Sequence, residues 1–221
     1  LMRRLKPAAV VGFGGYPTVP PLVAARLAGI PTVIHDANAV MGRANRFLSR
    51  RVSAIATSLP GVLDKEPSLV GKTTTTGTPM RPAILAAAAV PFVAPGADDA
   101  FRLLVVGGSQ GARVMSDIVF SAIEKLPAEL LSRLILTQQV RDEDMTRVRA
   151  VYDRLKVRAE LAPFFSDLPA RLASSHLVIS RSGAGTVAEL GAIGRPSILV
   201  PLPGAIDQDQ FANAGVLSQA N

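Results

Sequence analysis

The 221-residue sequence predicts an α/β protein with two Rossmann-like domains, each built on a doubly wound parallel sheet. Short apolar runs bounded by turn residues, which are typical of buried parallel strands, alternate with longer segments expected to be helical. The connections between them are short, and this alternation favours parallel sheets. A stretch rich in Pro, Ala and Gly at residues 78–98 separates two such halves, and the chain is long enough for two modest cores.

The first half predicts a small parallel sheet with two crossover helices. Its strands are expected at 8–12, 32–35, 54–57 and 72–76, and its helices at 19–28 and 41–50. The run at 72–76 is short and β-branched, which is typical of a strand. We assign residues 1–80 to this domain and residues 81–100 to a linker with at most one helical turn.

The second half, residues 101–221, alternates more regularly and forms the second predicted domain. Its strands are expected at 102–106, 133–137, 157–161, 176–180 and 197–200, and its helices at 112–125, 142–155, 167–174, 185–193 and 208–219. Doubly wound sheets bind ligands beyond the carboxyl ends of their strands. Every glycine-rich turn of the sequence falls at such an end, so we expect the functional residues there.

The composition excludes several kinds of site. The chain has no cysteine, which excludes thiolate zinc sites, disulfides and a catalytic cysteine. His35 and His176 are its only histidines, which excludes a histidine-rich metal site. No apolar run is long enough to cross a bilayer.

Positive charge is concentrated in the first part of the chain. Residues 1–95 contain 11 Lys and Arg against 3 Asp and Glu, a net charge of +8, whereas residues 96–221 contain 13 against 14. Anionic lipid headgroups, a phosphorylated substrate or nucleic acid would be attracted to this charge, and a generally basic proteome explains it equally well. The charged segments lack interleaved aromatic residues and nucleic-acid motifs, so no nucleic-acid partner is expected.

Residues 177–189 combine an apolar run, a turn of small residues and a helix start. Gly183 and Gly185 let a ligand approach the backbone closely. The first N–H groups of the helix favour a diphosphate, and Glu189 would bind sugar hydroxyls nearby. The alternative is a capping box, in which Glu189 reaches back toward Thr186. The two glycines make a nucleotide or nucleotide-sugar site at least as well supported.

A second turn follows the apolar run that begins at Leu103. It contains Gly107, Gly108, Ser109, Gln110 and Gly111. The pattern is typical of a phosphate-binding turn, although it is neither a Walker A loop nor a complete Gly-x-Gly-x-x-Gly motif, and an ordinary tight turn is the alternative. Together with the turn at 181–189 in the same predicted sheet, it favours a ligand site.

Two further segments of the second half carry candidate contacts. Phe164 and Phe165 lie in a strand-to-helix loop, where an aromatic ring stacks on a nucleobase or anchors the loop to the core. Asp207–Gln210 opens the last predicted helix. Its amides and carboxylates would bind sugar hydroxyls or form a solvated helix start.

Polar and glycine-rich residues also follow strands in the first half. Gly14, Gly15 and Tyr16 follow the first strand, and His35 and Asn38 end the second. A histidine at the carboxyl end of a strand can act as a catalytic base or contact the acceptor substrate. The alternative is a purely structural role in the fold. Arg43, Arg46 and Arg50 share one helix face, which would meet phosphate, lipid headgroups or solvent. Arg81, after Gly77–Pro79, would reach a phosphate.

As a set, these motifs resemble the MurG family of cell-wall N-acetylglucosaminyltransferases, which act on a lipid-pyrophosphate-linked muramyl peptide. The matching segments are Gly-Gly-Tyr-Pro-Thr at 14–18, His-Asp-Ala-Asn at 35–38, Gly-Thr-Pro-Met-Arg at 77–81, Gly-Gly-Ser-Gln-Gly-Ala at 107–112, Phe-Phe-Ser-Asp-Leu at 164–168, Arg-Ser-Gly-Ala-Gly-Thr-Val-Ala-Glu at 181–189 and Gln-Phe-Ala-Asn-Ala at 210–214. Their order and spacing match across nearly the whole chain. The resemblance implies the two-domain GT-B fold.

The resemblance also implies a role for each matched residue. The donor, UDP-N-acetylglucosamine, would be bound by Asn38, Arg81, Gly108, Ser109, Gln110, Phe164, Phe165, Ala184, Gly185, Thr186, Glu189 and Gln210. In this assignment Phe164 packs near the uracil, the backbone of Phe165 forms hydrogen bonds with the edge of the uracil, and Glu189 binds the ribose hydroxyls. Gly14, Gly15 and Tyr16 would lie on the acceptor and phosphate side, with His35 as a candidate catalytic group. No cofactor or metal ion is expected.

The chain departs from the family pattern in several respects, among them Thr18 in place of a serine, the ending Thr-Gln-Gln-Val at 137–140, and Asp209 where His or Gln is common. The family often has His-Glu-Gln-Asn where this chain has His-Asp-Ala-Asn at 35–38. The family's first glycine loop, which carries its main candidate base, would precede residue 1, and its final helices would follow residue 221. We therefore expect a chain truncated at both ends, with an incomplete N-terminal domain and little or no transferase activity.

The resemblance implies an inverting hexosyltransferase of peptidoglycan synthesis. Its partners would be UDP-N-acetylglucosamine, a lipid-pyrophosphate acceptor and an anionic membrane surface, on the cytoplasmic side of the inner membrane. Two alternatives remain. One is a diacylglycerol glycosyltransferase, and the other is a non-catalytic nucleotide-sugar-binding module that needs a partner chain.

Overall fold

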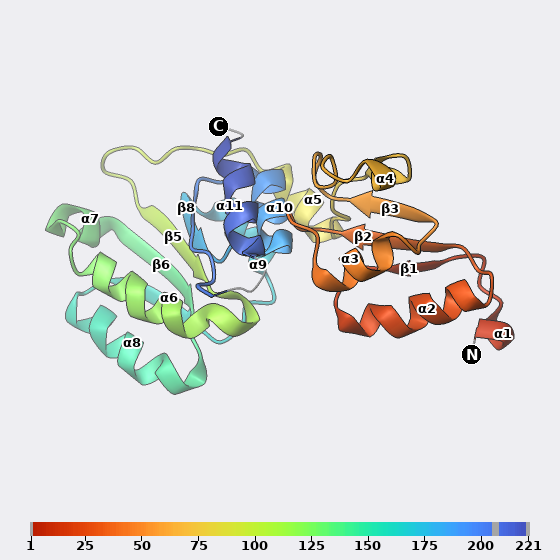
Figure 1. Ribbon diagram of the computed structural model, residues 1–221. Coiled ribbons are helices and arrows are strands. Elements are labelled where there is room, and N and C mark those ends of the chain that lie inside the picture. Colours follow the sequence, from red (N-terminus) through yellow and green to blue (C-terminus); the bar gives the residue numbers. More distant parts are fainter. Residues whose placement is uncertain (1, 205–207, 220–221) are drawn as a thin grey trace. The chain divides into compact units, whose positions relative to one another are not determined.

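The computed structural model describes residues 2–204 and 208–219, without the side chains of residues 3 and 109–112 (Figure 1). By its internal contacts the chain divides into two compact units. Unit 1 comprises Leu1–Pro79, Gly183–Gly185 and Pro203–Asn221, and unit 2 comprises Met80–Ser182 and Thr186–Leu202. Each unit contains one parallel sheet.

Unit 1 holds a four-stranded parallel sheet in the order β1-β2-β3-β4. The strands are β1 (Val10–Gly12), β2 (Thr32–Asp36), β3 (Ala54–Thr57) and β4 (Thr73–Thr75). The helical segments are α1 (Met2–Leu5), the 3₁₀ turn η1 (Tyr16–Thr18), α2 (Val19–Leu27), α3 (Arg43–Ser49) and α4 (Pro67–Val70). Leu22, Ile34, Leu48 and Ile55 form its buried core.

Helix α2 begins and ends where its sequence dictates. Pro20 and Pro21 lie in its first turn, where a missing N–H costs no helical hydrogen bond. The helix ends at Leu27, and Gly29 follows with a φ of 74°, a left-handed conformation that glycine adopts without steric cost. The chain then enters β2.

Unit 2 holds a five-stranded parallel sheet in the order β7-β6-β5-β8-β9. The strands are β5 (Phe101–Val106), β6 (Leu134–Gln139), β7 (Arg158–Ala162), β8 (Leu177–Ser180) and β9 (Ser197–Leu199). The chain winds outward from β5 to β7 and then returns to place β8 on the other side of β5. The sheet is therefore doubly wound, and its topological switch point lies between β5 and β8.

The helices of unit 2 precede and connect these strands. Helix α5 (Pro82–Ala88) precedes the sheet, and α6 (Gly108–Ile123), α7 (Ala128–Arg133), α8 (Asp142–Arg154), α9 (Leu168–Ser174) and α10 (Ala184–Ile193) lie between its strands. The first two residues of α10 group with unit 1, and α11 (Asp209–Gln219), which follows the sheet, belongs to unit 1. Leu103, Val105, Met115, Leu136 and Val148 are buried in the core between the sheet, α6 and α8. Helix α8 opens with three acidic residues and ends with Arg154, which complements its dipole.

The described residues contain every strand and helix that the sequence predicts. Most ends shift by one or two residues, and the largest shift is the start of α6, which begins at Gly108 rather than at residue 112. In unit 1 the described strands follow each other in sequence order, so only the sheet of unit 2 shows the doubly wound order. The short helices α1, α4 and α7 were not predicted, because four to six residues give too little periodicity to recognise.

The segment predicted as a linker, 81–100, begins with α5, which packs against α9 within unit 2. Buried Arg195 holds the end of this helix, because its guanidinium donates hydrogen bonds to the Val90 carbonyl at 2.8 Å and to the Ala173 carbonyl at 2.7 Å. The residues from Pro203 onward group with unit 1 rather than with the rest of the predicted 101–221 domain. Asn213 anchors them within unit 1 through hydrogen bonds to Asn38 and Ala39.

Candidate functional site

Helices α6 and α10 begin shortly after the carboxyl ends of two neighbouring strands of the unit 2 sheet. Val106 of β5 lies opposite Ser180 of β8, so α6 and α10 start from the same edge of the sheet. Gly108 opens α6 with a φ of 66°, which glycine tolerates. The side chains of Ser109 and Gln110 lie outside the described residues. Ala184, Gly185 and Thr186 form the first turn of α10, whose N–H groups have no partner within the helix.

Glu189 lies one turn into α10 and forms an ion pair with Arg81. The Arg81 Nη2 donates to the Glu189 Oε1 at 2.9 Å, and the side chains are 64% and 22% exposed. Thr186 is already helical, so it is not the N-cap that a capping box requires. Within the described residues, the Glu189 carboxylate accepts no backbone hydrogen bond. The capping-box alternative is therefore wrong, and the carboxylate is held by a charged side chain instead.

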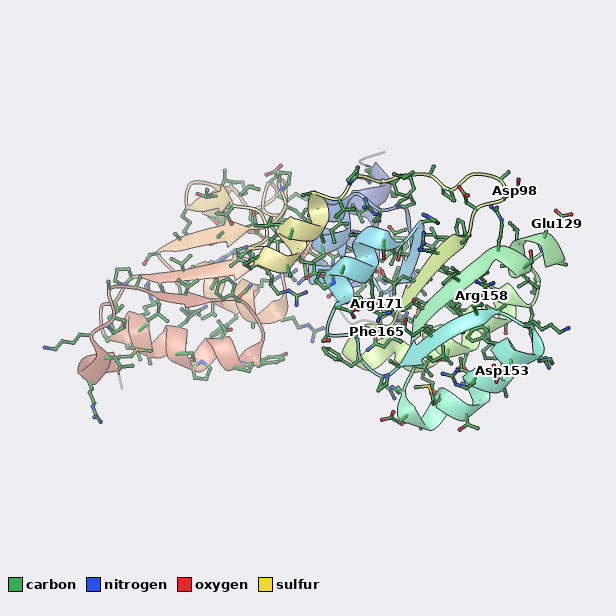
Figure 2. The ribbon with its side chains drawn as sticks, turned by 180° about the vertical axis from the view of Figure 1, so that it is seen from behind. Asp98, Glu129, Asp153, Arg158, Phe165 and Arg171 are labelled. Atoms are coloured by element: carbon green, nitrogen blue, oxygen red, sulfur yellow. The ribbon has the colours of Figure 1, made fainter. Side chains whose placement is uncertain are left out.

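The loop between β7 and α9 presents one phenylalanine to solvent and buries the other. Phe164 is 73% exposed, whereas Phe165 is 7% exposed. The Arg171 guanidinium lies over the Phe165 ring, with Cζ 4.4 Å from the ring centroid (Figure 2). The two alternatives for this loop thus apply to different residues, because Phe165 anchors the loop and the Phe164 ring is accessible for stacking.

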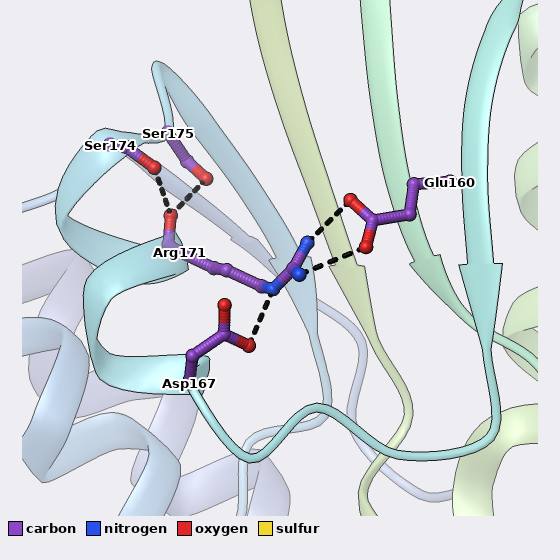
Figure 3. A network of polar contacts seen from close by, with 5 residues as sticks. All are labelled: Glu160, Asp167, Arg171, Ser174 and Ser175. Atoms are coloured by element: carbon purple, nitrogen blue, oxygen red, sulfur yellow. Dashed lines mark hydrogen bonds and ion pairs between the residues drawn. The ribbon is translucent and has the colours of Figure 1, made fainter.

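Arg171 also joins both ends of this loop through charged hydrogen bonds (Figure 3). Its Nη1 and Nη2 contact both carboxylate oxygens of Glu160 on β7, at 2.6 and 2.9 Å, and its Nε donates to Asp167 at 2.7 Å. These contacts raise the pKa of Arg171, and the hydrogen bond from Arg171 lowers the pKa of Asp167. The backbone carbonyl of Arg171 accepts from Ser174 and Ser175.

Arg181 fixes the chain between β8 and α10. Its side chain is buried, and Nη1 donates to the carbonyls of Val200 and Pro201 at 3.0 and 2.9 Å. Burial lowers the pKa of Arg181. Nε and Nη2 have no hydrogen-bond partner in the described residues. Arg181 therefore ties the segment after β9 to the end of β8, immediately before the first turn of α10.

In unit 1 the glycine turn after β1 lines a pocket of about 300 Å³. Gly14 and Gly15 have φ values of 87° and 75°, which only glycine adopts readily. Phe13 and Tyr16 are 68% and 74% exposed beside them. The pocket is completed by Asp36, Ala37, Asn38, Gly42, Arg43, Ala44 and Asn45.

Asp36 and Asn45 hold the wall of this pocket. Asp36 is 2% exposed, and its carboxylate accepts hydrogen bonds from the backbone of Asn38 and Gly42 and from Asn45 Nδ2 at 3.0, 3.1 and 2.9 Å. Asn45 Nδ2 also donates to the His35 carbonyl. Asn45 Oδ1 is buried without a hydrogen-bond partner in the described residues. The Asp36 carboxylate is thus used within the protein to shape the loop at 36–42.

His35, the candidate catalytic group, is 5% exposed. Its Nε2 lies 3.0 Å from the Gly77 carbonyl and 3.4 Å from Ser58 Oγ, which accepts from Thr78 Oγ1. Because a carbonyl only accepts, Nε2 carries the proton in this arrangement. The Phe13 ring packs beside the imidazole at a centroid distance of 5.5 Å. The geometry favours the structural alternative for His35.

Asn38 is held by helix α11 within unit 1. Asn38 Oδ1 accepts from Asn213 Nδ2 at 3.0 Å, and Asn213 Oδ1 accepts from the Ala39 backbone at 2.8 Å. Asn213 is 1% exposed. Gln210 is half-buried in the first turn of α11. The structure therefore places Gln210 and Asn38 on segments joined by Asn213.

Sequence reasoning did not single out four residues that shape these sites. They are Asp36, Asn45, Arg171 and Arg181. Only Arg171 carried a local signal, because an aspartate four residues earlier, Asp167, makes a favourable helical pair with it. The others act through residues distant along the chain or through loop backbone.

Among the described residues, no cluster of three or more His, Cys, Asp and Glu side chains is arranged to hold a metal ion. None of the described helices combines the length and the hydrophobicity that spanning a membrane requires.

Two parallel α/β units, with glycine turns and helix starts at the carboxyl ends of their strands, define a GT-B glycosyltransferase fold. Residues 102–221 match the glycosyltransferase family 28 C-terminal domain, and residues 1–57 match the glycosyltransferase family 28 N-terminal domain. The chain belongs to glycosyltransferase family 28.

The similarity extends over the whole chain. The chain is 84% identical over 218 residues to a transferase of Nitrobacter hamburgensis, and the match covers 99% of this chain and 59% of that protein. That relative is named UDP-N-acetylglucosamine–N-acetylmuramyl-(pentapeptide) pyrophosphoryl-undecaprenol N-acetylglucosamine transferase. The chain is 81% identical over 221 residues to the transferase of the same name from Bradyrhizobium sp. strain ORS 278, covering 100% and 60%. These similarities confirm the resemblance to the MurG family.

A solved structure gives the same result. The crystal structure of Acinetobacter baumannii MurG superposes with a TM-score of 0.78 at 31% identity, covering 99% of this chain and 60% of that one. The chain thus spans about three-fifths of the length of these relatives.

Proposed function

We propose that this chain carries the donor-binding domain and part of the acceptor domain of an inverting N-acetylglucosaminyltransferase. The enzyme would transfer N-acetylglucosamine from UDP-N-acetylglucosamine to a lipid-pyrophosphate-linked muramyl peptide. One observation carries the proposal. The start of α10, the Glu189 carboxylate and the exposed Phe164 ring follow strands of the unit 2 sheet at their carboxyl ends. The names of the similar transferases point to the same donor and acceptor.

The proposed donor contacts divide by chemistry. The first N–H groups of α6 and α10 bind the diphosphate, because these groups have no partner within their helix and lie at its positive dipole end. Glu189 binds the ribose hydroxyls, Phe164 stacks near the uracil, and the Phe165 backbone reads its edge. Arg81, Asn38 and Gln210 complete the donor contacts, together with Gly108, Ser109, Gln110, Ala184, Gly185 and Thr186.

The proposed acceptor side is the pocket of unit 1. Gly14 and Gly15 expose backbone that an acceptor phosphate or sugar can approach, and Tyr16 offers an exposed ring and hydroxyl. The net charge of +8 over residues 1–95 supports attraction of an anionic lipid acceptor and of an anionic membrane surface. We therefore place the enzyme peripherally on the cytoplasmic face of the membrane.

In the proposed reaction a base removes the proton from the acceptor sugar hydroxyl. The hydroxyl oxygen attacks the anomeric carbon, the bond to the diphosphate oxygen breaks, and UDP leaves with inversion. The helix N–H groups stabilise the charge that develops on UDP. His35 Nε2 donates its proton to the Gly77 carbonyl in a hydrogen bond. We therefore propose that His35 holds the 77–78 segment and does not act as the base.

Calorimetry with UDP-N-acetylglucosamine, UDP-glucose and UDP tests the donor. We expect UDP-N-acetylglucosamine to bind most tightly. A preference for UDP-glucose would favour the diacylglycerol glycosyltransferase alternative, and absence of binding by all three would refute the donor site.

A variant of Glu189 tests its role. Glu189→Gln removes the charged acceptor of the ribose hydroxyls, whose hydrogen bonds are worth about 1.5–3 kcal/mol, so UDP affinity should fall at least about tenfold. Glu129→Gln, an exposed change on α7 of the same unit, is the control (Figure 2). Wild-type UDP affinity in a folded Glu189→Gln protein would remove Glu189 from the site.

A further inference from the structure

We propose that Arg81 makes the diphosphate a condition for ribose binding, by holding the Glu189 carboxylate until a phosphate draws the guanidinium away. This inference rests on the proposed function, because it assumes that Glu189 binds ribose and that the start of α10 binds phosphate. It adds a selectivity between nucleoside diphosphates and nucleosides that neither residue provides alone.

The ion pair occupies the group that the ribose needs. A ribose diol is bound best when each hydroxyl donates to one carboxylate oxygen, and Arg81 Nη2 already lies 2.9 Å from Glu189 Oε1. A nucleoside without phosphate must therefore share or displace a charged donor. It offers the guanidinium nothing in return.

The geometry allows Arg81 to leave without disturbing the fold. Its backbone is fixed, because it precedes Pro82 at the start of α5 and its carbonyl accepts from the Ile84 N–H at 2.9 Å. Its side chain is 64% exposed and can therefore change rotamer. Surface ion pairs of this kind are weak, so a stronger anion can replace the carboxylate.

The inference requires the released side chain to reach a diphosphate bound at the start of α10. Glu189 is five residues beyond Ala184, which corresponds to about 7.5 Å along a helix axis. An arginine side chain anchored near one end of this distance can turn toward the other. The diphosphate carries more negative charge than a single carboxylate, so the exchange is favourable for UDP and not for uridine.

Calorimetry with uridine and UDP on the wild type and on Arg81→Met tests the inference. We expect Arg81→Met to bind uridine about two- to fivefold more tightly, the value of a lost surface ion pair. We expect it to bind UDP at least about threefold more weakly, so that the preference for UDP over uridine falls about tenfold. Arg154→Met is the matched control, because Arg154 is 65% exposed and pairs with Glu124 in the same unit.

The outcomes separate the inference from the proposed function. An equal change for both ligands, or no change for either, would overturn the role of Arg81 while leaving the donor site intact. A wild-type protein that binds neither ligand would instead refute the donor site itself. A preference for UDP that falls equally in Arg154→Met would show a general charge effect and would also overturn the inference.

Discussion

Replacing Arg171 by methionine should loosen the loop that carries Phe164 and leave the fold intact. The side chain of Arg171 is 23% exposed and holds the loop at three points, through Glu160, Asp167 and the Phe165 ring. Methionine keeps the unbranched aliphatic chain but has neither charge nor hydrogen-bond donors. The loop then loses its tie to β7 and the contact that keeps Phe165 buried.

The magnitude follows from the exposure of these contacts. Glu160 is 57% exposed, which weakens its pair with Arg171, but the pair is bidentate, so it contributes about 0.5–1 kcal/mol. The guanidinium over Phe165 contributes about 0.5–1 kcal/mol. Together these give about 1–2 kcal/mol, a factor of about 5–30 in an equilibrium constant.

Calorimetric titration with UDP, combined with thermal melting, measures both consequences. We expect UDP affinity to fall about five- to thirtyfold, because binding must then supply the free energy of ordering that Arg171 supplies in the wild type. Arg158→Met, an exposed change near the start of β7, should leave affinity unchanged (Figure 2). Wild-type UDP affinity in Arg171→Met, with the expected loss of melting temperature, would refute the idea that this brace serves nucleotide binding.

Three further predictions concern stability. Burial, and to a smaller extent the charge of Arg102, lower the pKa of His176. The neutral imidazole accepts the Arg102 backbone N–H at Nδ1. This stabilisation is therefore present above about pH 6.5 and is lost as the pH falls through the lowered pKa of His176. Melting at pH 7.5 and 5.5 should show a smaller drop in His176→Gln than in the wild type, and an equal drop would contradict this. Arg195→Met should cost unit 2 about 3 kcal/mol in urea unfolding, because buried carbonyls lose a charged donor, and a loss below about 1 kcal/mol would be inconsistent with the contacts seen. Asp36→Ala leaves three donors without their acceptor and should destabilise unit 1 by about 2–4 kcal/mol in thermal or urea unfolding, whereas a fully stable variant would show that water replaces the carboxylate.

Local pattern was sufficient to predict where strands and helices lie. The apolar run at 103–106 became the central strand β5, and the glycine turns after it and after β8 became helix starts. These features depend on periodicity and on backbone freedom, which neighbouring residues determine. Glu189 and Phe164 were predictable for the same reason, since each lies in or just after a turn at the end of a strand.

The partners of the polar side chains depended on tertiary structure. Arg81 and Glu189 are 108 residues apart in sequence, and Asn38 and Asn213 are 175 apart. No local pattern distinguishes an arginine that faces solvent from one that holds a carboxylate, or a histidine with a free lone pair from His35, whose Nε2 faces a carbonyl. The sequence by itself determined the two parallel sheets and the edges at which ligands would bind. Only the packing of distant segments decided which of the side chains at those edges already have a partner, because such pairs form when the chain closes on itself.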